Sequence, residues 1–112
     1  MTRLIGDQLL MRIFIGETDR YEHKPLYEAL VELLRKEGFA GATVLRGVCG
    51  FGAHKVFHSQ KLLDLSADLP MVVEAVDNQE KINSILPSIH EMMAGGMITL
   101  ENISVLRYSS KK

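Results

Sequence analysis

The sequence has little cysteine, few aromatic residues and no long apolar run. Its single cysteine, Cys49, cannot form a disulfide within the chain. No apolar run reaches the roughly 18 residues that a membrane-spanning helix needs. The N-terminus also lacks the apolar run and small-residue cleavage site of a secretory signal. We therefore expect a cytoplasmic protein with no direct membrane insertion.

A strong charge of either sign is also missing. The formal net charge is −1, whereas nucleic-acid-binding domains usually carry a strongly basic face. We therefore expect no nucleic-acid partner. Aromatic residues make up 6% of the chain and Trp is absent, so the core must be mainly aliphatic. A length of 112 residues with 46% hydrophobic residues predicts a single folded domain, residues 1–112.

The first half of the chain has the periodicity of a strand, a helix and two further strands. Residues 1–7 are predicted to be a loose lead-in, and the nearly continuous apolarity of residues 8–15 is typical of a central strand. Pro25 suits the first position of a helix and Gly38 suits its C-terminal cap, which predicts a helix over residues 25–37. The next strands are predicted over residues 42–48 and 61–66.

The second half repeats the order of strand, helix and strand. A strand is predicted over residues 71–76, and Asp77 with Glu80 resembles a capping box that starts a helix. Pro87 lies inside this helix and is expected to bend it, and the helix ends at a glycine pair. The last strand is predicted over residues 97–108, with an interruption at residues 101–102. Residues 109–112 are predicted to form a mobile tail.

This order of elements predicts an α+β fold. It matches the ferredoxin-like βαββαβ sandwich, in which an antiparallel sheet carries both helices on one face. The other face of the sheet then needs a cover that this chain cannot supply. A closed homo-oligomer is therefore expected.

A set of motifs spread over residues 9–108 is specific as a combination, although each motif alone is weak. The motifs are residues 10–15, 16–17, 24–29, 41–47, 50–52, 68–70 and 80–82. Together they resemble an uncharacterised bacterial and archaeal family, the domain of unknown function numbered one hundred and ninety. That family in turn resembles the PII signal-transduction proteins.

Three segments carry the resemblance to PII proteins directly. Residues 41–52 are similar to the PII strand that enters the long T-loop, and residues 69–77 resemble the approach to the second helix. Residues 105–107 resemble the C-terminal strand whose arginines face the nucleotide. The resemblance implies a PII-like closed homotrimer with three lateral clefts, each lined by the T-loop base and by the loop after the second helix.

The resemblance also implies a regulatory function rather than an enzyme. A PII-like protein binds a small ligand, an adenine nucleotide or another anion, in its intersubunit clefts. It would report that ligand through the loop at residues 48–60 to a partner, either a membrane transporter or a metabolic enzyme. Two departures leave AMP, ADP, a cyclic nucleotide and a different anion open: residues 94–98 contain no lysine, and the spacing from Thr43 to Gly50 is one residue longer than in PII.

The candidate ligand residues are of two kinds. Gly47, Gly50 and Gly52 could form a nest of backbone amides for an anion, or simply a flexible loop. Arg46 and Arg107 could bind phosphate in bidentate fashion, or could occupy solvated strand faces and ion pairs between subunits. The full ligand-binding set is Thr43, Arg46, Gly50, Phe51, Gly52, Lys55, Gly95, Gly96 and Arg107.

Other reactive residues form no readable site. His54 and His58 are four residues apart, which on a helix would suit a metal, but a metal site needs three or four ligands and exposed loop histidines explain the pair more simply. Cys49 has no readable catalytic partners, and the acidic residues of the turn after the first strand are explained as solvated: Glu17, Asp19 and Glu22.

Two alternative functions belong to other classes. One is a metal-binding trimer that resembles the CutA proteins, which share this fold, and it would use His54 or His58. The other is an assembly partner of a membrane transporter that binds no ligand. Loss of metal uptake on substitution of either histidine would identify the first alternative.

Overall fold

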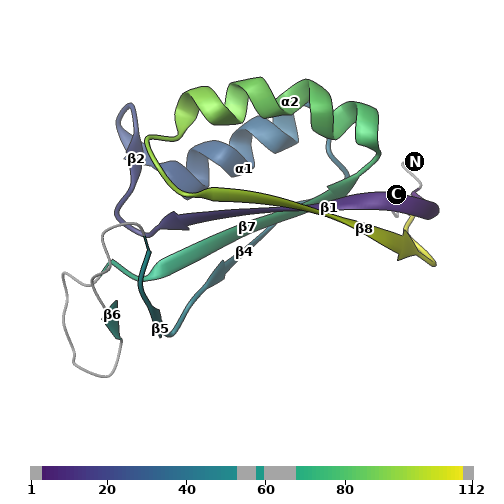
Figure 1. Ribbon diagram of the computed structural model, residues 1–112. Coiled ribbons are helices and arrows are strands. Elements are labelled where there is room, and N and C mark those ends of the chain that lie inside the picture. The colour runs from purple at the N-terminus through teal and green to yellow at the C-terminus, as the bar shows by residue number, and fades with distance from the viewer. Residues whose placement is uncertain (1–3, 53–57, 60–67, 110–112) are drawn as a thin grey trace.

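The computed structural model describes residues 4–52, 58–59 and 68–109, with the backbone alone at 58–59. Four antiparallel strands form one sheet in the order β4-β7-β1-β8, and both helices lie on one face of it (Figure 1). The main elements are β1 (Gly6–Gly16), α1 (Leu26–Lys36), β4 (Thr43–Arg46), β7 (Pro70–Asp77), α2 (Gln79–Met92) and β8 (Met97–Val105). Two small hairpins pair β2 (Arg20–Tyr21) with β3 (Lys24–Pro25) and β5 (Cys49–Gly50) with β6 (His58–Ser59). The predicted ferredoxin-like α+β fold is confirmed.

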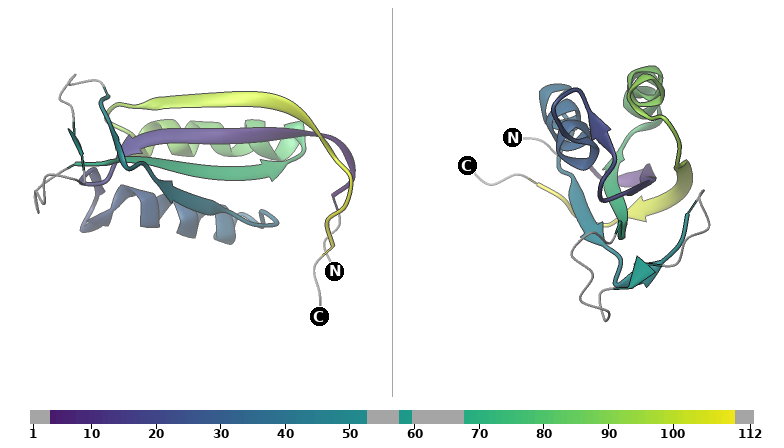
Figure 2. Two further views of the ribbon diagram at one scale, coloured as in Figure 1. Left: turned by 90° about the horizontal axis from the view of Figure 1, so that it is seen from below. Right: turned by 90° about the vertical axis from the view of Figure 1, so that its left-hand side faces the viewer.

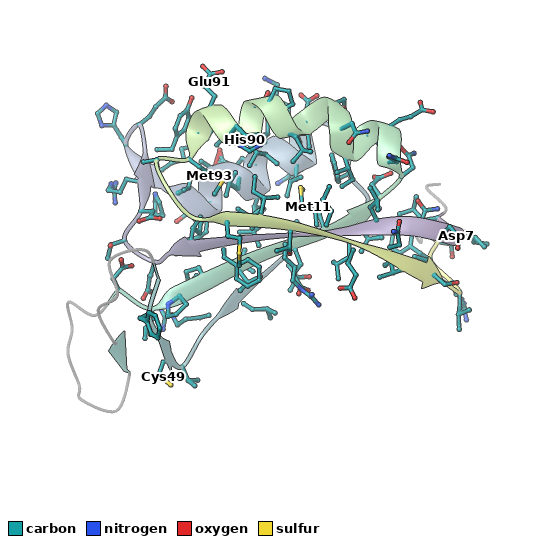
Figure 3. All side chains as sticks on the ribbon, in the orientation of Figure 1. Asp7, Met11, Cys49, His90, Glu91 and Met93 are labelled. Carbon is teal, nitrogen blue, oxygen red and sulfur yellow. The ribbon has the colours of Figure 1, made fainter. Side chains whose placement is uncertain are left out.

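The core lies between the sheet and the two helices. Alternate residues of β1 and β7 point towards the helices, as Met11 does in Figure 3. Each fully buried aliphatic side chain contributes about 1.5–3 kcal/mol, and a slip of one residue would turn these side chains to the other face. This alternation therefore fixes the register of the sheet. The core residues of the strands and helices are Met11, Ile13, Ile15, Leu26, Leu30, Leu34, Met71, Val73, Ala75, Ile82, Ile85 and Ile89.

The first helix forms near the predicted range of 25–37, but it starts one residue later because Pro25 is not its first residue. Leu26, Leu30 and Leu34 make its buried stripe, and the helix begins immediately after Pro25, which is its N-cap. Gly38 has a φ of +81° and donates its N–H to the Arg35 carbonyl at 3.1 Å. The predicted glycine cap at the end of α1 is therefore confirmed.

The second helix starts one residue later than the predicted capping box. Its N-cap is Asn78, whose side-chain oxygen accepts the Lys81 N–H at 2.8 Å. Asp77 instead ends β7, is 3% exposed, and accepts the Asn78 N–H at 2.8 Å. The prediction that Asp77 and Glu80 form the capping box was wrong, because Asp77 points to the buried side of β7. The helix continues past Pro87 to Met92, as the apolar period predicts.

Three predicted boundaries are corrected by strand pairing. β1 begins at Gly6, because Gly6 already pairs with Val105 of β8, so the loose lead-in is shorter than predicted. β8 shows no interruption at residues 101–102, since both residues pair with β1, and it ends at Val105 rather than at Tyr108. β4 is likewise shorter than the predicted 42–48. The predicted strand at 61–66 lies outside the described residues.

Neither helix covers the opposite face of the sheet, and within the described chain β5 lies on that side at one end (Figure 2). One row across it is apolar, where Leu45 pairs with Val72, Val72 with Phe14, and Phe14 with Met97. Leu45 is 48% exposed and Met97 is 53% exposed. This open row, defined by Leu45, Val72, Phe14 and Met97, belongs to the face for which the sequence predicts contact with other copies of the chain.

A charged group lies beside the open row. Arg12 donates from Nε to Glu74 at 2.8 Å and from Nη1 to Glu101 at 3.3 Å. The hydrogen bond to Glu74 raises the pKa of Arg12.

Neither helix of the described residues is long and apolar enough to cross a membrane.

Candidate ligand site at the loop base

The predicted ligand residues fall at two opposite ends of the sheet. Arg46 pairs with Met71, next to the end of β1, whereas Val105 pairs with Gly6 at the start of β1. Met71 pairs with Ile15 of β1, so nine residue steps from Gly6 to Ile15 separate these ends, a distance of about 30 Å. Figure 1 shows β5 at one end and the end of β8 at the other. The structure therefore brings Arg46 near the loop glycines and places Arg107, which follows β8, at the far end of the same subunit.

Arg46 is held by a carboxylate from the turn after β1. Its Nη2 donates to Oε2 of Glu17, and the side chains are 51% and 23% exposed respectively. The sequence grouped Glu17 with the solvated acidic turn, and that prediction was wrong for this residue. The two partners lie 29 residues apart, so no local pattern could reveal the pair.

The same turn also holds the start of β7. The Glu17 N–H donates to the Leu69 carbonyl at 2.8 Å, and the Thr18 N–H donates to Oδ1 of Asp68 at 2.8 Å. A Cβ at Gly16 would lie 2.7 Å from both carboxylate oxygens of Asp68, so a side chain there would displace this carboxylate. We call Glu17, Thr18, Arg46 and Asp68 the loop-base cluster. It ties both ends of the segment between β4 and β7 to the end of β1.

One of the three loop glycines is not available for the predicted amide nest. The Gly47 N–H donates to the Pro70 carbonyl at 2.7 Å, so this amide is already used within the chain. Gly50 has a φ of +153° and pairs with the backbone of His58, whereas Gly52 has no positive φ. Phe51 is 66% exposed beside them.

The two glycines after α2 have different surroundings: Gly96 is closely packed, and Gly95 is not. Gly96 has a φ of +113°, and a Cβ there would lie 2.5 Å from the Phe14 carbonyl oxygen. Gly95 has no atom within 4 Å of such a Cβ. Gly96 is therefore needed for the turn into β8, whereas Gly95 of the pair faces open space.

The described part of the chain contains no group of residues that would support the metal hypothesis. No cluster of three His, Cys, Asp or Glu residues that could hold a metal ion occurs there. His54 and Lys55 lie outside the described residues, as does the side chain of His58. Cys49 is exposed and lies on the side of the sheet away from the helices (Figure 3).

A groove of about 380 Å³ lies on the helix side, apart from the predicted residues. Lys24 and Glu32 both line this groove, and Nζ of Lys24 donates to Oε1 of Glu32 at 2.7 Å. None of the predicted ligand residues that the structure describes lines it. Its other walls include Tyr21, Leu33, Glu91 and Met92.

Residues 8–105 match the family described as Uncharacterized ACR, the domain of unknown function numbered one hundred and ninety. The chain belongs to this family. A UPF0166 protein of Aquifex aeolicus (strain VF5) is 41% identical over 97 residues, which are 87% of this chain and 91% of the relative. A UPF0166 protein of Methanocaldococcus jannaschii is 33% identical over 99 residues, 88% of this chain and 91% of the relative.

Members of another group of proteins have the same fold. CPII, a nitrogen regulatory PII-like protein from Thiomonas intermedia K12 solved with ADP, AMP and bicarbonate, superposes with a TM-score of 0.64 at 18% identity over 91% of each chain. The GlnK–ATP complex of B. subtilis superposes with a TM-score of 0.57 at 17% identity, over 90% of this chain and 85% of that chain. The resemblance to the PII fold is therefore confirmed for this family member.

Proposed function

We propose that this protein is a PII-like regulatory protein rather than an enzyme. It acts as a closed homotrimer that binds an adenine nucleotide or another small anion, such as bicarbonate, in the clefts between subunits. Ligand occupancy is reported through residues 48–60 to a protein partner, a membrane transporter or an enzyme. The ADP, AMP and bicarbonate bound to CPII and the ATP bound to GlnK support this choice of ligands.

The separation of Arg46 from Arg107 is the observation that carries the proposal. About 30 Å of strand divides the two ends of the sheet, too far for one small ligand to reach both arginines of a single subunit. A cleft between two subunits can combine the loop end of one with the β8 end of its neighbour. The binding site is then complete only in the oligomer.

The open row supports the same assembly. Its four apolar side chains cross all four strands, and the helices cover only the opposite face. Contact with copies of the same chain would bury this row and supply the free energy of association. The Arg12, Glu74 and Glu101 group beside it would then fix the orientation of the neighbouring subunits.

The first experiment tests ligand binding by isothermal titration calorimetry. Wild-type protein is titrated with ADP, AMP, ATP and bicarbonate, and Arg46→Ala and Arg107→Ala are expected to weaken binding by roughly 10- to 100-fold, because each removes a charged hydrogen-bond donor. Arg35→Ala is the matched control, since Arg35 is an exposed arginine in the last turn of α1. The proposal is refuted if the wild-type protein binds none of the four ligands.

Mixed trimers test whether the site is shared between subunits. Arg46→Ala and Arg107→Ala subunits are unfolded, mixed and refolded together. A mixed trimer in the proposed arrangement contains one cleft with both arginines, so part of the binding returns. Binding that stays lost in the mixture would show that the two arginines do not meet across subunits.

A further inference from the structure

The Arg46 guanidinium already binds an anion supplied by its own chain. Oε2 of Glu17 accepts a hydrogen bond from Nη2 of Arg46. A carboxylate, a bicarbonate ion and a phosphate all present oxygen acceptors to a guanidinium, and Arg binds each through the same N–H donors. An incoming oxyanion at Arg46 therefore meets a position that Glu17 occupies.

Glu17 is well placed to hold Arg46 because its own backbone is fixed. Its N–H donates to the Leu69 carbonyl at 2.8 Å, and its side chain is 23% exposed, less than half the exposure of the Arg46 side chain. A partly exposed guanidinium can reach a ligand from solvent without leaving its strand. The carboxylate can turn away from it by a change of rotamer.

We propose that Glu17 is an internal competitor for the anion site at Arg46. This inference rests on the proposed function and names the regulation of its ligand site. In the state without ligand, Glu17 holds Arg46. An oxyanion with a planar O–C–O group, such as bicarbonate, or a nucleotide phosphate takes the guanidinium and releases Glu17.

The release of Glu17 would affect the contacts at both ends of the segment between β4 and β7. Arg46 ends β4, while Thr18, the next residue after Glu17, donates its N–H to Asp68 at 2.8 Å just before β7. The Glu17 N–H and the Leu69 carbonyl form a second link at the same place. Ligand exchange at one side chain therefore acts on the turn that anchors both ends of this segment.

A purely structural ion pair predicts the opposite effect of substitution. If the pair only positions Arg46 for its ligand, removal of the Glu17 charge leaves the arginine less ordered, and ligand binding weakens or stays the same. If Glu17 competes, removal of its charge strengthens binding. The sign of the change separates the two roles.

The test uses Glu17→Gln, Arg46→Gln and the double variant in the full chain. Calorimetry with ADP and with bicarbonate is expected to show two- to fivefold tighter binding to Glu17→Gln, the range that corresponds to the loss of an exposed ion pair worth up to about 1 kcal/mol. The gain should vanish in the double variant. Glu28→Gln, an exposed acid on α1, should bind like wild type.

A second measurement follows Arg46 itself. The Nε–Hε resonance of Arg46 is monitored by NMR during bicarbonate titration of wild type and Glu17→Gln. We expect half-saturation at a two- to fivefold lower bicarbonate concentration in Glu17→Gln. Equal or weaker ligand binding by Glu17→Gln, with binding by wild type intact, overturns the competition and leaves the proposed function standing.

A failure of the proposed function can also be distinguished from a failure of the competition by Glu17. If neither protein binds ADP, AMP or ATP, but the Arg46 resonance responds to less bicarbonate in Glu17→Gln, the nucleotide part of the proposed function fails and the competition is supported. If the resonance responds in neither protein, the competition is overturned.

Discussion

Gly96 lies where the chain turns from α2 into β8, and replacing it with alanine tests how this crossing is built. A residue with a side chain at a φ of +113° costs about 1–3 kcal/mol in backbone strain. The new Cβ would also lie 2.5 Å from the Phe14 carbonyl oxygen, which belongs to the central strand and cannot turn aside. Shifting the backbone to relieve that overlap costs about 1–3 kcal/mol more.

The expected destabilisation by Gly96→Ala is therefore about 3 kcal/mol, a large part of the roughly 5–15 kcal/mol that stabilises a typical domain. Urea unfolding followed by circular dichroism measures it. With an m value of about 2 kcal/mol/M, the midpoint should fall by about 1.5 M. All proteins are compared at one concentration, because oligomers gain apparent stability from association.

The neighbouring residue is the matched control for this substitution. Gly95 has no positive φ in the range that disfavours side chains, and no atom lies within 4 Å of an added Cβ. Gly95→Ala should therefore change the unfolding free energy by less than about 0.5 kcal/mol, or stabilise slightly by restricting the unfolded chain. A midpoint for Gly96→Ala within error of that of Gly95→Ala would refute the reasoning.

Two further substitutions address the ends of the helices by the same urea assay. Asn78→Ala removes the side-chain cap of the Lys81 N–H and should lower the free energy of unfolding by about 1 kcal/mol. The control Gln79→Ala should leave this free energy nearly unchanged. Equal effects of the two substitutions would contradict the cap. Lys81→Met keeps the aliphatic stem but loses the 2.8 Å hydrogen bond from Nζ to the Gly38 carbonyl, with an expected cost of about 1–2 kcal/mol. Lys36→Met, an exposed control on α1, should cost less than about 0.5 kcal/mol, and a similar loss in both lysine variants would argue against the Lys81 bond.

Much of the fold could be predicted because it depends on local periodicity. Alternate apolar residues in β1 and the leucine stripe of α1 each specify one buried face, and these faces allow few arrangements. The boundaries were less predictable. Asp77 and Asn78 are both good caps by residue type, and only the buried side of β7 decides that Asp77 ends the strand while Asn78 caps the helix.

The candidate site was predictable in part. Arg46 was a candidate for phosphate binding or for an ion pair because of its guanidinium, and the structure shows an ion pair with Glu17. Glu17 was missed, because its partner lies 29 residues away and its own neighbours suggest a solvated turn. The use of Gly47 in the glycine nest was missed for a similar reason, since its N–H donates to the Pro70 carbonyl across the loop base.

The sequence by itself determined which residues form most of the helices and strands, which of their faces are buried, and that the helices cover one face of the sheet. These properties follow from the repeat of the backbone and from the transfer of apolar side chains out of water. The tertiary structure alone decided that Glu17 binds Arg46, that Gly96 packs on Phe14, and that Arg46 and Arg107 lie at opposite ends of the sheet. Each of these depends on the distance between residues far apart in the chain, which the pairing of the strands sets.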